Sequence, residues 1–240
     1  MYFQLGFSFS FKDEIKEIFK NINQTTDENV IDTVNEHNNE IGKLLLKIEL
    51  IQQAGFFINS SCNEVLKEVE NDIINSLIFM SQAFYRNSMM CLRSAIELSL
   101  SYVYYHDHNY EYILWKNNKV DMAWAKLFSE EGIISEKYLS LFISGQLKIG
   151  EFRDKIRECY HECSEYVHGK YMYMQSINEM QIKYDETAVK EYFVQVNNVV
   201  DIMILLLFIR FGKEYEFYIK LNDKIDIWNP IIKRYGGEWK

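Results

Sequence analysis

Long segments of the chain place apolar residues three and four positions apart, the spacing that puts them on one face of an α-helix. The segment 61–82 shows this spacing from Val65 to Met80, and the segment 84–105 repeats it. The same period, together with capping residues, predicts further helices over 26–54, 147–168 and 186–211, and a short one after Ser135. Because the 240 residues include one proline and ten glycines, few turns are available, and an all-α fold is predicted.

The two ends of the chain show a different pattern. Leu5 to Phe11 and Tyr215 to Leu221 alternate between apolar and polar or small residues, which is the period of strands. These segments are expected to be extended and could pair with each other. No internal repeat or Gly/Ser linker divides the helices, so a single domain is expected over 1–240. Its parts are an extended N-terminal arm (1–12), a helical bundle (13–212) and a C-terminal arm (213–240).

Composition and charge limit the cellular locations and the classes of partner that are expected. The 35 acidic and 26 basic residues give a formal charge of −9, which argues against broad attraction to a nucleic-acid backbone or an anionic membrane. The four cysteines lack the spacing of a disulfide framework, and the first residues do not resemble a signal peptide, so a cytoplasmic location is expected. The most apolar run, Val199 to Phe211, is about 13 residues long, whereas a membrane span needs about 20. We therefore expect a buried helix there and no membrane partner.

The helix predicted over 147–168 carries the clearest candidate chemistry. At 100° per residue, Phe152, Ile156 and Cys159 fall on a core face. A neighbouring stripe, about 22 Å long, holds five polar side chains: Arg153, Arg157, His161, Ser164 and His168. Arginine suits phosphate and histidine exchanges protons near neutral pH, which is what metal-free RNA cleavage requires. The structural alternative is a set of ion pairs, for example Asp154 with Arg157 or Glu158 with His161.

Two segments, Tyr85 to Tyr105 and Phe152 to Tyr171, resemble helices of the HEPN superfamily. In the first, Glu97 follows Arg93 by four residues within an apolar helix, and in the second a polar helix ends in His168 followed by Gly169. The superfamily comprises small helical bundles found in toxins, phage-defence systems and RNA-processing proteins. The resemblance implies an HEPN-like bundle that forms a homodimer with its two Arg/His helices facing each other. It also implies an RNA substrate and a cognate antitoxin or another defence-system protein as partner.

Together, the stripe and the resemblance predict a metal-independent endoribonuclease. Its catalytic residues would be Arg157, His161 and His168, and its binding residues Arg153, Ser164, Arg93 and Glu97. The motif is degenerate, because none of the positions that match the family's Arg before His168 (His161, Glu162 and Cys163) is Arg. A non-catalytic HEPN-like domain that binds a partner protein, a nucleotide or RNA is therefore the alternative. For Arg93 and Glu97, the alternative is an ion pair that fixes helix register.

Neither a metal nor a cofactor is expected. A zinc site could be drawn from Cys159, Cys163, His106 and His108, but both cysteines lie on the predicted core face. The sequence contains no Gly-rich phosphate loop and no hydrolase or zinc-protease motif. The common nucleotide-cofactor and hydrolase classes therefore lose support.

Overall fold

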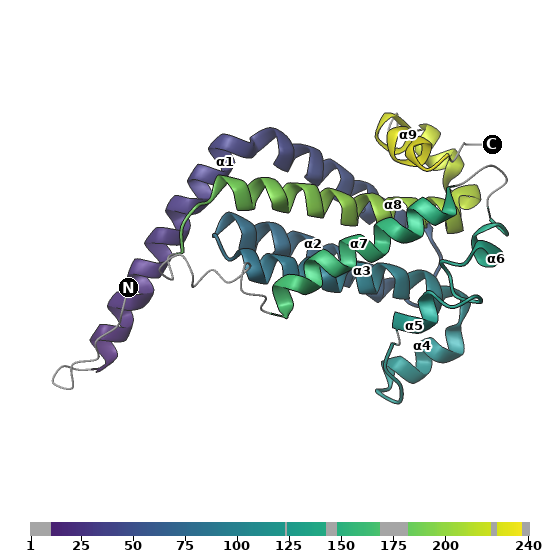
Figure 1. Cartoon of the computed structure of the whole chain (residues 1–240), viewed down its shortest axis with the longest axis horizontal. Coiled ribbons are helices and arrows are strands. Elements are labelled where there is room, and N and C mark those ends of the chain that lie inside the picture. Colours follow the sequence, from purple (N-terminus) through teal and green to yellow (C-terminus); the bar gives the residue numbers. More distant parts are fainter. Residues whose placement is uncertain (1–10, 123, 143–147, 169–181, 222–224, 237–240) are drawn as a thin grey trace.

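The computed structural model describes residues 11–122, 124–142, 148–168, 182–221 and 225–236. Within these ranges the chain forms nine helices and no strand, so the all-α prediction is confirmed (Figure 1). They are α1 (Phe11–Phe57), α2 (Asn63–Ser81), α3 (Tyr85–Asp107), α4 (Asn109–Lys116), α5 (Trp124–Leu127), α6 (Glu136–Leu139), α7 (Ile149–Val167), α8 (Glu186–Leu221) and α9 (Ile225–Arg234). Each of the five long segments predicted to be helical lies almost entirely within one of these helices.

Helix α3 is the centre of the bundle and packs against α2, α7 and α8. Helix α1 covers α2 and α8, and its N-terminal part extends beyond the other helices (Figure 1). The short helices α4, α5 and α6 lie near the C-terminal end of α3, and α9 packs on α8. This arrangement explains why α3 buries one face from Met89 to Ile96 and every residue from Ser99 to Tyr105.

Helix α8 contains the most apolar run of the chain. Its segment Glu186–Gly212 is long and apolar enough to cross a membrane, but 78% of the most apolar window is buried inside the bundle. Residues 199 to 209 are all buried. A helix that is surrounded by other helices has no face exposed to solvent and needs no polar residues there. This accounts for the apolar composition of this part of α8.

The predicted start of the first long helix is wrong. Thr25 and Glu28 form a capping-box pattern, yet α1 begins at Phe11. The Thr25 hydroxyl donates within the helix to the Asn21 carbonyl at 2.9 Å, and Glu28 accepts from Gln24 at 3.1 Å. Both side chains are therefore satisfied by a helix that has already formed. The one non-helical residue inside α1 is His37, where the helix bends beside the Tyr184 hydroxyl, 3.1 Å from Nε2.

The predicted C-terminal arm is also wrong. Tyr215 to Leu221 belongs to α8, which passes through Gly212, and α9 lies within 223–240. The apolar residues of this segment also fit a helical period, because Phe211, Tyr215, Tyr218 and Leu221 are four, three and three positions apart. Extending an existing helix avoids the cost of nucleation, so the helical period prevails. Of the predicted N-terminal arm, Phe11 and Lys12 are helical, and Leu5 to Ser10 lie outside the described residues.

Candidate functional site

The two segments that carry the family resemblance pack against each other as α3 and α7. Helix α7 buries Phe152, Ile156, Cys159 and Cys163, so its predicted core face is confirmed. The polar contacts between the two helices join Arg86, Arg93 and Glu97 of α3 to Tyr160 and Val167 of α7. We call this line of contacts the α3–α7 seam.

The middle of the seam is a closed hydrogen-bond network of three side chains. Arg93 Nη2 donates to the Tyr160 hydroxyl at 2.9 Å and to Glu97 Oε1 at 3.3 Å, while the Tyr160 hydroxyl donates to the same carboxylate oxygen at 2.9 Å. Partial burial tends to lower the pKa of Arg93, but its hydrogen bond with Tyr160 and the nearby Glu97 charge raise the pKa above its usual value. The predicted Arg93–Glu97 pair therefore exists, and Tyr160 locks it to the second helix.

Two of the five stripe residues of α7 face inward. The Ser164 hydroxyl is buried and donates to the Tyr160 carbonyl of its own helix at 2.7 Å. Arg153 Nη2 donates to the Phe128 carbonyl at 3.4 Å, and Arg153 Nε is buried without a partner among the described residues. Ser164 thus bonds within its own helix, and Arg153 directs Nη2 to the backbone just after α5.

The three residues predicted to be catalytic lie on the outer part of the stripe. The Arg157 guanidinium sits over the Phe128 ring, 5.0 Å from its centroid, and 3.9 Å from Asp154. The His161 side chain is 71% exposed and its Nε2 lies 3.5 Å from Glu165, whereas Glu158 pairs with Lys155. His168 caps α7 through its backbone N–H, which donates to the Ser164 carbonyl, and is exposed. None of these three side chains lines the pocket described next.

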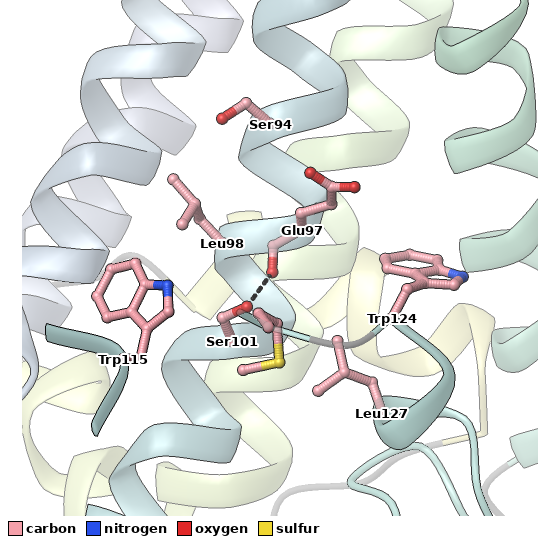
Figure 2. A pocket seen from close by; sticks show the side chains of 8 residues that line it. Ser94, Glu97, Leu98, Ser101, Trp115, Trp124 and Leu127 are labelled. Carbon is pink, nitrogen blue, oxygen red and sulfur yellow. Dashed lines mark hydrogen bonds between the residues drawn. The ribbon is translucent and has the colours of Figure 1, made fainter. Parts of the chain in front are cut away.

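A pocket of about 210 Å³ opens on the face of α3 that carries Glu97 (Figure 2). Figure 2 shows the indole rings of Trp115 and Trp124 on opposite sides of this helix, with the Glu97 carboxylate between them. The remaining lining residues are Ser94, Leu98, Ser101, Met122 and Leu127. Trp124 also stacks on Tyr160, with ring centroids 3.9 Å apart and planes at 20°, so the pocket and the seam share a wall.

Sequence reasoning missed four of the residues that build this region: Arg86, Tyr160, Trp115 and Trp124. Arg86, seven positions before Arg93 and therefore on the same face of α3, donates to the Val167 carbonyl at 2.9 Å. The seven-residue spacing from Arg93 could have identified Arg86 from the sequence. The tryptophans lie outside the long helices, in α4 and α5, and no period connects them to α3.

The residues considered for zinc do not come together. Cys159 and Cys163 are buried on the core face of α7, while His106 bonds to Ser60 at 3.0 Å and His108 stacks on Tyr104. Among the described residues, no group of three or more potential ligands could hold a metal ion. The cysteines are free thiols, and contact with Cys159 together with burial raises the pKa of Cys163.

No family model, curated protein or solved structure matches this chain. The HEPN resemblance therefore depends on the residues of α3 and α7 alone.

Proposed function

We propose that this protein is a helical binding domain, the non-catalytic of the two roles predicted, and that it recognises a ligand or a partner's side chain in the Glu97 pocket. The observation that carries this proposal is the Glu97 carboxylate, held in place by Arg93 and Tyr160 at the wall of the pocket. A charged group that is already ordered loses little conformational entropy when a ligand arrives. Its position between two indole rings is typical of binding sites, which combine apolar walls with few polar groups.

The arrangement favours binding over catalysis within one chain. His161 and His168 are about 10 Å apart along the helix axis, and each stands on a convex, exposed helix surface outside the pocket that Glu97 lines. Glu97 Oε1 accepts hydrogen bonds from Arg93 and from the Tyr160 hydroxyl, which hold the carboxylate in one position, as a binding group requires.

A pocket-filling variant tests the binding proposal even while the ligand is unidentified. Leu98→Phe adds volume at the pocket wall, and Leu141→Phe makes the same change at a side chain that is 72% exposed and outside the pocket. We expect at least one compound from a panel of amines, amino acids and nucleotides to raise the melting temperature of the wild type and of Leu141→Phe, but not of Leu98→Phe. Equal shifts in all three proteins, or no shift in any, would overturn the proposal.

The second candidate function is the metal-independent endoribonuclease, acting as an HEPN-like toxin or phage-defence protein. The observation in its favour is that Arg157, His161 and His168 are all exposed on the surface of α7. They would form a composite site only if a second copy of the chain placed its own α7 opposite them. This candidate therefore requires a symmetric homodimer, which sedimentation at micromolar concentration would detect.

A further inference from the structure

We propose that the Glu97 pocket binds a small organic cation, an alkylammonium group carried by a free amine or by a lysine side chain of a partner. This inference rests on the proposed binding function and adds the chemical class of the ligand. It is drawn from the lining of the pocket, which combines one carboxylate and two indole rings with two serines and three aliphatic or thioether side chains.

The carboxylate keeps one oxygen available for the ligand. Glu97 Oε1 accepts the hydrogen bonds from Arg93 and Tyr160, whereas Oε2 has no hydrogen-bond or ion-pair partner among the described residues. Glu97 lines the pocket, whereas Arg93 does not. An anionic ligand would meet the carboxylate first and would be repelled.

The indole rings add a second attraction for the same class of ligand. The face of an indole carries negative potential and attracts ammonium groups, most strongly where water is excluded. Trp124 is held by its stack on Tyr160, and Trp115 packs against Tyr105 with ring centroids 5.1 Å apart. Both rings are therefore ordered before a ligand binds.

The size of the pocket limits the ligand. Sites for drug-sized molecules measure about 300–1,000 Å³, and this pocket measures about 210 Å³. It can enclose an ammonium group with a short aliphatic chain. A whole nucleotide exceeds this space, and its phosphates would face Glu97.

The test uses the full chain and four probes of similar size. These are n-butylammonium, choline, the neutral choline analogue 3,3-dimethylbutan-1-ol, and the anion butyrate, titrated while tryptophan fluorescence or heat is measured. We expect the two cations to bind at least about tenfold more tightly than the neutral analogue, and butyrate not to bind. Equal affinity of choline and its neutral analogue would overturn the cation assignment.

Variants locate the effect in the pocket. Glu97→Gln should lower cation affinity about tenfold, while the matched control Glu151→Gln, an exposed glutamate of α7 outside the pocket, should leave it unchanged. Trp115→Leu should weaken binding and Trp115→Phe should retain most of it, because a phenyl ring keeps a π face. This pair keeps the test decisive even if Glu97→Gln fails to fold, which thermal melting would reveal. Cation affinity that is unchanged in both Glu97→Gln and Trp115→Leu would overturn the inference.

The two sources of the alkylammonium group can be separated. A blocked lysine, N-acetyl-lysine methylamide, is compared with n-butylammonium. Tighter binding of the blocked lysine indicates that the ligand is a partner's side chain. Tighter binding of n-butylammonium indicates that the ligand is a small molecule. If the neutral analogue or butyrate binds the wild type at least as tightly as the cations do, and Leu98→Phe abolishes that binding, the cation class is wrong and the binding function stands. If no probe binds and the broader panel also fails, both are overturned.

Discussion

Arg93 of α3 donates from Nη2 to the hydroxyl of Tyr160 on α7 at 2.9 Å, and this bond links the seam to the pocket. The same tyrosine bonds Glu97 with its hydroxyl and stacks Trp124 with its ring. One side chain of α7 thus positions both a charged group and an aromatic wall of the pocket. The register of α7 on α3 and the shape of the pocket should therefore depend on each other.

Removing only the hydroxyl tests this dependence. In Tyr160→Phe the ring remains to stack on Trp124, while Arg93 and Glu97 each lose one partner. We expect the free energy of unfolding in urea to fall by about 1 kcal/mol. Tyr166→Phe is the control, because that hydroxyl makes an exposed bond to Glu191 at 3.3 Å. An unchanged unfolding midpoint for Tyr160→Phe would show that the network does not stabilise the seam.

A second network fastens α1 and α9 to α8. Asp201, on the buried part of α8, accepts from Lys47 Nζ at 2.7 Å and from Arg234 Nη1 at 3.1 Å. Only 7% of the Asp201 side chain and 17% of the Lys47 side chain are exposed, whereas Arg234 is 55% exposed. The two cations should therefore contribute unequally.

Asp201→Asn should destabilise the protein strongly. The neutral amide leaves the Lys47 ammonium without its counter-charge in a largely buried position, at a cost of about 3 kcal/mol. Arg234→Ala removes only the exposed partner and should cost about 1 kcal/mol or less. Thermal and urea unfolding of both variants measure the difference, and equal losses would contradict the assignment of Lys47 as the principal partner.

The core face of α7 and the period of α3 could be predicted from sequence because helical burial repeats every three to four residues. The Ser135 cap could also be predicted, since its hydroxyl accepts from Tyr138 N at 3.1 Å, within one turn. Local chemistry decides such features. The local pattern was not sufficient at the end of α8, because Tyr215 to Leu221 fits both the two-residue period of a strand and the three-to-four-residue period of a helix.

Only part of the candidate site could be predicted from the sequence, because local patterns reveal contacts within one helix and not contacts between helices. Arg93 and Glu97 share one helix, so their pairing follows from spacing alone. Tyr160 joins them from 63 positions beyond Glu97, and Trp124 reaches Tyr160 from a four-residue helix. Contacts of this kind are set by how α7 and α5 pack on α3, which no single-segment pattern encodes.

The pH dependence of stability offers a test at another position. Hydrogen bonds from Lys116 and then Tyr112 lower the pKa of Glu64, on α2, from 4.5 to about 2. Because this pKa is lower in the folded state, the stabilisation is fully present above pH 4.5 and is lost as the pH falls toward 2. The gap in melting temperature between the wild type and Glu64→Gln should therefore narrow over that interval. The exposed Glu68→Gln is the control, and a gap that is constant from pH 6 to about pH 2 would contradict the prediction.

The outer stripe of α7 separates the two candidate functions. If the protein is a metal-independent ribonuclease, His161→Ala or His168→Ala should reduce RNA cleavage about a hundredfold or more, through loss of proton transfer. Arg157→Ala should act similarly through loss of phosphate stabilisation, and EDTA should have no effect. Because all three side chains are exposed, each substitution should change the free energy of unfolding by no more than about 0.5 kcal/mol. Lys155→Ala, on the same helix but outside the stripe, is the matched control.

If the wild type does not cleave RNA, or if the three variants cleave as fast as Lys155→Ala, the nuclease candidate is wrong. In that case the stripe is ordinary solvated surface, and the Glu97 pocket remains the site through which the chain would act.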